Sequence, residues 1–459
     1  MTQTAVPTTA VPEGGTAPLS PKKARFLKKL SVVIAGGMFI DGFILGGIGL
    51  VMPAITKDLG LSATWEGLIG ASALIGIFIG GPLGGWLADR FGRRPMFTVD
   101  LLVFLAGSVA QFFVGEAWEL FLVRVVMGIA IGADYSIGWP LLAEFAPARL
   151  RGKLLAFQEV AWYIGYLLAY SAGYALQTST SVDWHLILAL STIPTVLVLL
   201  LRLGIPESPR WLMSQGRTEE ATAVAREFME EAEQRDLETQ TPSEAKGFSR
   251  IFSRDHLKTT VFICTFWICN VTPYFAIGTF APSVLEQMGI KDGLTGALAI
   301  NGVVVIGAII SVLLVERVGR RKLAVPPFWI CAVALAVVGL LPHPTAAVIL
   351  VCFLVFSVAN AVSTTLAGVY PGEVFPTGIR GAGVGFATAA SRVGAAAGTF
   401  LLPLSVGALG MAGTVLIAAA ISLVGGIVSH RLAPETKGLQ LSAASAAGRV
   451  GGGDGGSSQ

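Results

Sequence analysis

Charged residues are scarce in this chain: they make up 13% of its 459 residues, whereas soluble domains carry about 25%. Hydrophobic residues make up 53% of the chain, and the mean hydropathy is +0.71. A soluble fold of this size could not bury so much apolar surface, but a bilayer core about 30 Å thick accepts apolar helices of about 20 residues. The composition therefore excludes a soluble protein and predicts one that crosses a membrane many times.

Residues suited to catalysis or metal binding are also few and scattered. The four cysteines fall inside apolar stretches without a C-x-x-C pair, and the four histidines lie far apart in sequence. Small buried side chains account for such cysteines, and the histidine spacing does not form a metal site. Motifs for a nucleophile, a phosphate loop or paired carboxylates are missing. We therefore expect no enzymatic activity, metal, cofactor or nucleic-acid binding, and the net charge of only +3 agrees with the last point.

What the chain does have is a series of apolar runs separated by charged or turn-rich breaks, which predicts an all-α membrane protein. The expected spans are 31–52, 66–87, 96–115, 119–142, 154–175, 184–204, 258–280, 293–315, 323–341, 345–368, 380–403 and 408–429. They make twelve transmembrane helices in two pseudo-symmetric six-helix bundles, and the 56 glycines suit close helix packing in lipid. The expected domains are a disordered tail (1–27), a first bundle (28–205), a central loop with a charged, solvated helix around Thr218–Gln234 (206–257), a second bundle (258–432) and a C-terminal tail (433–459), disordered from 440 onward.

Short motifs recur about half the chain length apart, which indicates a duplicated unit. An acidic residue followed by Arg-x-Gly-Arg-Arg begins at Asp89 and again at Glu316, 227 residues later. Glu-x-x-Pro-x-x-x-Arg-Gly begins at Glu144 and again at Glu373, 229 residues later. A weaker echo links Pro206-Glu207-Ser208 to Pro434-Glu435-Thr436.

The basic residues of the short loops lie almost entirely on one side of the predicted membrane. The opposite loops offer only Lys57 and Lys291. Because Lys and Arg mark the cytoplasmic side, we expect a multi-pass protein of the cytoplasmic membrane with both termini and the central loop in the cytoplasm.

The motif Gly-x-Leu-x-Asp-Arg-x-Gly-Arg-Arg at residues 85–94, together with two six-span repeats, resembles the major facilitator superfamily. Arg124-x-x-x-Gly128 and the Pro-Glu-Ser and Pro-Glu-Thr strings are similar to its sugar-porter branch, over roughly residues 25–440. The resemblance implies parallel halves around a central site near the bilayer midplane, which rock to expose that site to either side in turn. We expect the chain to act as a monomer in the lipid bilayer.

The repeated charged motifs predict a gate on the cytoplasmic side. Asp89 can meet a helix N-terminus while Arg93 and Arg94 pair with carboxylates such as Glu144. The alternative is that these charges only fix topology, but topology requires positive charge and not a repeated acidic residue. The gate candidates are Asp89, Arg93, Arg94, Glu144, Arg151, Glu316, Arg317, Arg320, Arg321, Glu373 and Arg380.

Ionisable residues inside the spans are candidates for coupling transport to protons, since each costs at least about 2.5–3.5 kcal/mol to insert. Asp41 and Asp134 are the expected proton carriers, with Glu159 in either a coupling or a gate role. Arg124 is expected to tune these acids, and it stands too far along its helix from Asp134, about 15 Å, to pair with it. The alternative for each acid is a permanent ion pair or a packing hydrogen bond. Asp100 is close enough to the end of its span to reach water, and we expect it to be structural.

Arg392 is the expected contact for the substrate, because a guanidinium in a helix of small residues needs either a protein carboxylate or an anionic ligand. The further substrate-binding candidates are Tyr163, Tyr166, Tyr274 and Asn360.

Two patterns favour an anionic substrate. The string 41–44, Asp-Gly-Phe-Ile, resembles the aromatic-acid symporters, and the string 132–135, Gly-Ala-Asp-Tyr, resembles the proton-phosphate symporters. We therefore expect proton-coupled symport of a small organic acid or a related polar metabolite. The alternatives are a sugar or polyol symporter, a phosphate symporter, an exporter of drugs or metabolites, and a non-transporting sensor.

Overall fold

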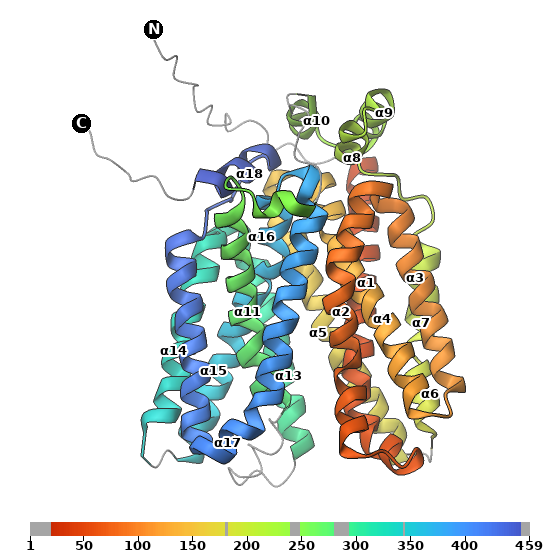
Figure 1. Cartoon of the computed structure of the whole chain (residues 1–459). Helices are drawn as coiled ribbons and strands as arrows, with labels where there is room; N and C mark the ends of the chain where they lie inside the picture. The colour runs from red at the N-terminus through yellow and green to blue at the C-terminus, as the bar shows by residue number, and fades with distance from the viewer. Residues whose placement is uncertain (1–19, 180–181, 239–247, 280–292, 343–344, 451–459) are drawn as a thin grey trace, which may run out of the picture.

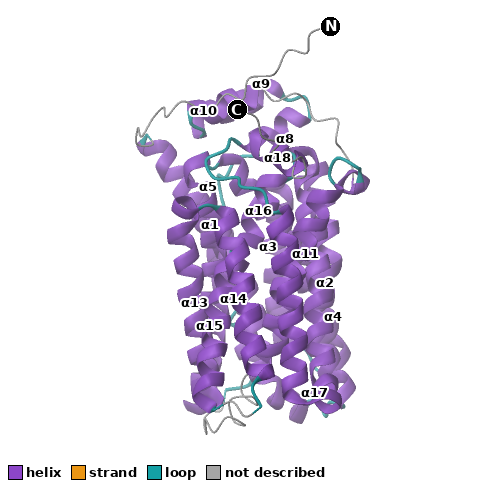
Figure 2. Ribbon diagram, turned by 90° about the vertical axis from the view of Figure 1, so that its left-hand side faces the viewer, coloured by secondary structure: helices purple, strands orange, loops and turns teal. Residues whose placement is uncertain are grey.

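The computed structural model describes residues 20–179, 182–238, 248–279, 293–342 and 345–450, and within them the regular elements are all helices. The helices form two upright bundles side by side, and short helices cover one end of them (Figure 1). Seen from the side, the long helices run parallel to one another through the whole height of the protein (Figure 2). The expected all-α membrane fold is confirmed.

The first bundle holds six spans. Its chain direction reverses at capped turns: the Ser62 hydroxyl caps the second helix, and Gly92 takes a φ of +108° between the second and third helices, a conformation that favours glycine. The sixth span is broken at Leu190–Ser191 into two pieces. The helices are α1 (Pro21–Asp58), α2 (Ala63–Phe91), α3 (Arg93–Ala110), α4 (Ala117–Phe145), α5 (Ala148–Ser179), α6 (Trp184–Ala189) and α7 (Thr192–Leu201), with a 3-10 turn at Gln111–Phe113.

The second bundle repeats this order. Gly319 takes a φ of +98°, as Gly92 does in the first bundle, and the last two spans form one continuous helical run that turns at Gly410, where φ is +71°. The helices are α11 (Leu257–Thr279), α13 (Gly293–Val318), α14 (Arg320–Leu340), α15 (Ala346–Thr364), α16 (Leu366–Val374) and α17 (Arg380–Leu432), with 3-10 turns at Phe248–Phe252 and Thr377–Ile379. Counting α6 with α7 and α15 with α16, and α17 as two, the described residues give the twelve expected spans.

The surface of the bundles suits a bilayer. In the part of the chain that the structure describes, nine helical stretches are by themselves long and apolar enough to cross a membrane. Large apolar side chains such as Phe78, Val126 and Leu313 point outward and are about half exposed. An apolar exterior is what lipid tails require of a membrane protein.

The two bundles meet where glycines allow backbones to touch. A methyl group on Gly85 of α2 would lie 2.2 Å from the carbonyl oxygen of Gly381 on α17, and one on Gly385 would lie 1.9 Å from the carbonyl oxygen of Gly81. The only side chain small enough for this contact is hydrogen, so the close approach of α2 and α17 depends on these glycines.

The polar segments differ from the sequence prediction in three places. The charged stretch expected as one solvated helix is two, α9 (Thr218–Phe228) and α10 (Glu231–Glu238), preceded by α8 (Pro209–Ser214). These helices are docked rather than free, since Glu233 and Asp236 are buried. The expected disordered tails also contain helix: α1 begins at Pro21, and α18 spans Leu441–Val450 and packs on α16. Residues 1–19 and 451–459 lie outside the described residues.

Candidate functional site: a charged latch and a central cavity

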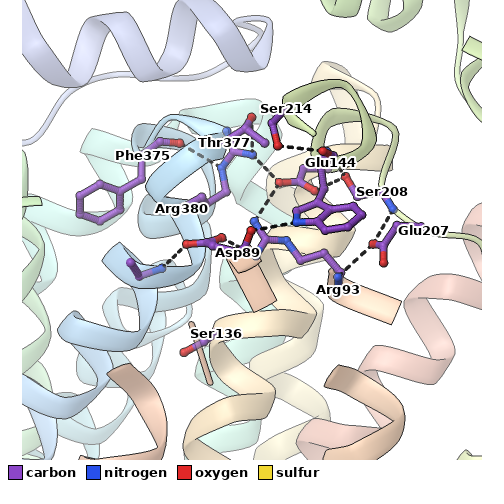
Figure 3. Close-up of polar contacts among 12 residues, drawn as sticks. Asp89, Arg93, Ser136, Glu144, Glu207, Ser208, Ser214, Phe375, Thr377 and Arg380 are labelled. Carbon is purple, nitrogen blue, oxygen red and sulfur yellow. Dashed lines mark hydrogen bonds and ion pairs between the residues drawn. The ribbon is translucent and has the colours of Figure 1, made fainter. Parts of the chain in front are cut away.

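A cluster of buried charges holds the two bundles together at the end covered by α8–α10 and α18. We call Asp89, Arg93, Glu144 and Arg380 the latch. Glu144 of α4 accepts from Arg93 at 3.4 Å and from Arg380 at 2.8 Å, and Arg380 belongs to the second bundle (Figure 3). The side chains of Arg93, Glu144 and Arg380 are each at most 1% exposed. Glu144 therefore pairs with arginines from both halves in a site closed to water, and Asp89 supplies the second negative charge by pairing with Arg93 at 2.7 Å.

Asp89 of the latch and its repeat counterpart Glu316 each cap a helix of the opposite half. Asp89 at the end of α2 accepts from the backbone N–H of Ala382 at 3.0 Å, in the first turn of α17. Glu316 at the end of α13 accepts from the backbone N–H of Lys153 at 3.1 Å, near the start of α5. A negative charge at a helix N-terminus is stabilised by the unpaired N–H groups there. The duplicated motif thus makes the same cross-bundle contact twice.

Two further glutamates support these motifs and were not predicted from the sequence, although the repeated Pro-Glu-Ser and Pro-Glu-Thr strings contain them. Glu207 accepts from the backbone N–H groups of Arg93 and Arg94 at 3.0 and 3.1 Å, so that it caps α3. Glu435 caps α14 in the same way. Burial raises the pKa of Glu207 above its usual value, while these N–H groups favour its charged form. The next residue in each string, Ser208 or Thr436, donates to Glu144 or Glu373.

The ion pairs in the second-half counterpart of the latch lie within one bundle. Arg320 pairs with Glu316 at 2.7 Å and with Glu373 at 2.8 Å, all on helices of the second half. Arg151, the counterpart of Arg380, makes no ion pair within the described residues and donates instead to the carbonyl oxygen of Leu439 at 3.1 Å. Among the described residues, the carboxylate that forms an ion pair across the bundles is therefore Glu144, whereas Glu373 pairs with Arg320 of its own bundle and acts on Arg151 only through a longer-range electrostatic interaction.

Within the described part of the chain, the Arg94 side chain makes no ion pair with a carboxylate, although the sequence predicted one. Its backbone N–H bonds to Glu207 while its side chain is exposed, because the position follows Gly92 on the outer side of the first turn of α3. Arg321 likewise donates to the carbonyl oxygen of His430 at 2.6 Å. Arg317 contributes its carbonyl oxygen, which accepts from Lys437 at 2.8 Å. These three residues lie around the charged centres rather than in them.

A small cavity lies between the two bundles, deeper in the protein than the latch. Arg392 lies on α17 twelve residues after Arg380, which is about 18 Å along the helix. The cavity has a volume of about 30 Å³, room for about one water molecule. A substrate larger than that requires the halves to move apart. Its wall is formed by Tyr135, Trp139, Glu159, Trp162, Tyr163, Trp267, Val271, Tyr274, Phe275, Thr364 and Arg392.

Aromatic side chains from both halves close this cavity. Trp139 of α4 contacts Trp267 of α11 with ring centroids 5.5 Å apart, and Tyr163 of α5 contacts Tyr274 of α11 at 6.2 Å. The guanidinium of Arg392 lies over the Tyr135 ring, 5.5 Å from its centroid. Arg392 is 5% exposed, and it makes no ion pair with any residue that the structure describes.

Four of the predicted substrate and coupling residues therefore share the cavity: Arg392, Glu159, Tyr163 and Tyr274. Tyr166 stacks on Trp162 with centroids 5.6 Å apart, outside the cavity wall. Asn360 lies one layer behind, where its amide donates to the carbonyl oxygen of Asn270 at 3.0 Å.

The predicted proton-coupling acids interact with one another, whereas Arg124 lies elsewhere in the first bundle. Asp41 of α1 is fully buried, and it interacts electrostatically with Asp134 on one side and with Arg392 and Glu159 on the other. Arg124 lies apart from these acids, and its hydrogen bond within the described residues goes to Gln111 at 3.5 Å. The expectation that Asp100 reaches water is wrong, because its side chain is buried, with 3% of the residue exposed, and pairs with Arg202 at 3.7 Å.

A larger cavity of about 840 Å³ lies between α11, α15 and α17 of the second bundle. Its wall is apolar apart from residues such as Thr272, Ser405 and Thr414, and it holds no charged group. The charged side chains Glu159 and Arg392 are in the wall of the small central cavity and not in that of the larger one.

Comparison with known proteins agrees with this geometry. Residues 24–447 match the protein family described as "Sugar (and other) transporter". The chain belongs to this family. The inner membrane metabolite transport protein YgcS of Escherichia coli is 39% identical over 428 residues, which cover 93% of this chain and 95% of YgcS. The protein is thus a membrane transporter and not an enzyme.

The names of more distant relatives state which compound each of those proteins transports. The niacin transporter NiaP of Acinetobacter baylyi is 26% identical, covering 81% of this chain and 85% of NiaP. The proton:xylose symporter XylE of E. coli, solved with 6-bromo-6-deoxy-D-glucose, is 24% identical with a TM-score of 0.79, covering 92% of this chain and 99% of XylE. At that identity, the likeness to XylE establishes the fold alone.

Proposed function

We propose that this transporter carries a small organic acid together with protons, by alternating access through the central cavity. The observation that supports it is Arg392, a guanidinium in the cavity wall without an ion pair inside the described residues. A buried cation is costly unless an anion accompanies it, and the acids Glu159 and Asp41 interact with Arg392 electrostatically but form no ion pair with it within the described residues. Aromatic rings around it would pack against an apolar or aromatic part of the acid. NiaP, a relative that carries niacin by name, handles an acid of this kind.

We further propose that the protein lies in the cytoplasmic membrane with the latch end facing the cytoplasm. The name of the relative YgcS places that protein in the inner membrane. Arg90, Arg149 and Lys322 all lie at this end, and basic loops mark the cytoplasmic side. With the latch closed, the described state is shut toward the cytoplasm. The proton would be carried by the buried acids on the first-half side of the cavity, beginning with Asp41.

Replacing Arg392 with alanine should lower kcat/KM for uptake of the acid about 100-fold or more, because the substrate carboxylate loses its charged partner. We would measure uptake into proteoliposomes, with and without an inward proton gradient, of labelled nicotinate, benzoate, succinate, glucose, sorbitol and phosphate. Arg392→Lys is the matched control, and it should retain part of the activity because it keeps the charge while losing the planar fork.

Other outcomes of this panel are equally informative. Uptake of glucose or sorbitol that Arg392→Ala leaves unchanged would contradict the proposal and favour a sugar or polyol symporter like XylE. Uptake of phosphate alone would keep the anion and change its class. Acid uptake that is the same with and without the proton gradient would remove the proton coupling and leave the substrate class standing.

A further inference from the structure

A second group of buried charges lies within the first bundle, beyond the central cavity. We call Asp41, Asp100, Asp134 and Arg202 the inner acid cluster. They come from α1, α3, α4 and the residue that ends α7, and each is at most 5% exposed. Nothing in the sequence motifs points to Asp100 or Arg202, because the four helices are far apart in the chain.

The cluster is built around the ion pair between Asp100 and Arg202, and both groups also interact electrostatically with Asp134. Arg202 approaches the Asp100 carboxylate at 3.7 Å and interacts with Asp134 as well. The Asp100 and Asp134 carboxyl groups interact with each other. Arg202 is fixed in place, since it also donates to the carbonyl oxygen of Phe97 and lies 3.0 Å over the Phe97 ring centroid. Two acids and one cation therefore share a dry space.

The helix sequences leave room for this arrangement. A methyl group on Gly37 of α1 would lie 2.6 Å from a carboxylate oxygen of Asp134. The glycine thus lets the Asp134 carboxyl group sit against the backbone of α1, four residues before Asp41 in the chain. Gly37 and Asp41 are about one helical turn apart and therefore lie on the same face of α1. The Asp134 carboxyl group thus lies against the face of α1 that carries Asp41.

The charges in the cluster do not balance. Three carboxyl groups face one guanidinium, and one oxygen of Asp100 and both oxygens of Asp41 and Asp134 have no hydrogen-bond partner within the described residues. The surrounding charges are Glu159 and Arg392 near Asp41, and Glu207 and Arg94 near Arg202. Two adjacent carboxylates cannot both stay ionised beside one cation in a site closed to water. At least one proton must therefore reside in the cluster.

A proton suits this cluster better than a metal ion. Among the described residues, no three His, Cys, Asp or Glu side chains come close enough together to hold a metal. A sodium site would require several oxygen ligands around one point, whereas a proton requires only one carboxyl oxygen.

We propose that Asp100 and Asp134 form a proton-binding site balanced by Arg202, and that Asp41 passes the proton between this site and the central cavity. The inference rests on the proposed proton-coupled transport and adds two residues, Asp100 and Arg202, to its machinery. The proton binds to a carboxylate oxygen from one side of the membrane and leaves to the other, with no bond to a heavier atom formed or broken. Arg202, and not Arg124, is the arginine that tunes the acids.

The test compares two activities of Asp100→Asn in proteoliposomes, with labelled nicotinate first and then any other acid that the uptake panel identifies. Accumulation driven by a proton gradient should fall about tenfold or more, while exchange at equal pH on both sides should stay within about twofold, because exchange returns with its proton bound. Asp100→Glu, which restores a carboxyl group, should recover part of the accumulation. Asp255→Asn, an exposed acid of the central loop, is the control and should change neither activity.

Infrared difference spectroscopy of the substrate-free protein supplies a second readout that does not depend on transport. Titration should show the carboxyl band of a protonated acid in the wild type, and Asp100→Asn should change that band. Normal gradient-driven accumulation by Asp100→Asn, or an unchanged band, would overturn the inference. Accumulation driven by a sodium gradient instead would overturn it as well. If the wild type accumulates nothing in a proton gradient, the proposed function fails, and the infrared titration alone decides on the site.

Discussion

Glu144→Gln should open the protein at the latch end and raise the population of the open state about 100-fold relative to the closed state. Glu144 is the single acid between Arg93 and Arg380, and it also accepts from Ser208. Removing its charge leaves the buried Arg380 without its carboxylate partner, while Arg93 keeps Asp89 at 2.7 Å, and an uncompensated buried charge costs about 3 kcal/mol or more. In the open state these arginines reach water, and each 1.4 kcal/mol shifts the populations tenfold.

The accessibility of a cysteine placed behind the latch measures this shift. Ser136 lies on α4 eight residues before Glu144, deeper in the protein and in contact with α2 and α17 (Figure 3). The reporter Ser136→Cys is introduced after the four native cysteines, which are all free thiols, are replaced with serine. In membrane vesicles that expose the latch end, an impermeant thiol reagent should label it much faster in the Glu144→Gln protein.

Glu373→Gln is the matched control for Glu144→Gln. Glu373 occupies the repeated position and pairs with Arg320 at 2.8 Å, but this pair lies within the second bundle. Its loss should leave the labelling of Ser136→Cys nearly unchanged. Equal labelling in both variants would show that loss of any buried carboxylate loosens this end, and labelling that stays slow in the Glu144→Gln protein would contradict the latch.

Gly385→Ala should also prevent closure at the latch end, for a steric reason. The added methyl group would meet the carbonyl oxygen of Gly81 at 1.9 Å, and this backbone oxygen cannot rotate away. Overpacking of this kind costs about 1–3 kcal/mol, which corresponds to about a 5- to 150-fold change in the balance of two states. The transport rate should fall because the closed state becomes rare.

Pulsed electron resonance distances between spin labels at Arg90 and Lys322 check this prediction. Both side chains are exposed at the latch end, one in each bundle. The distance distribution should move to longer values in the Gly385→Ala protein. Gly302→Ala is the control, because a methyl group there meets no described residue within 4 Å and should leave the distribution unchanged. A wild-type distribution in both variants would mean that α2 and α17 adapt to the methyl group by a local shift.

Several elements of the fold follow from the sequence alone because their causes are local. Apolar runs of membrane-crossing length gave the spans, and the repeated Asp89 and Glu316 motifs gave the two bundles. The predicted single charged helix was wrong because Met229 adopts an extended conformation and ends α9. The tail after residue 440 was predicted to be disordered because its composition is dominated by small residues, yet α18 is held by Asp236, which accepts from Ser442.

The candidate site followed from the sequence only in part. Arg392, Glu159, Tyr163 and Tyr274 could be chosen because polar or aromatic side chains in a span are conspicuous. That Tyr166 and Asn360 lie outside the cavity wall could not be deduced, because neither the rotation of a helix nor the packing of its neighbours is encoded in one short string of residues.

The sequence by itself determined that this chain crosses the membrane twelve times in two related halves, with a charged motif at one end of each. Hydrophobicity and repetition are properties of the chain read in order, and they do not depend on which helices touch. Only the tertiary structure decided which charges meet: that Glu144 joins the halves while Glu373 does not, and that Asp100 belongs with Asp134 and Arg202. The physical reason is that a buried charge takes its partner from another helix, and the partner is set by how the helices pack.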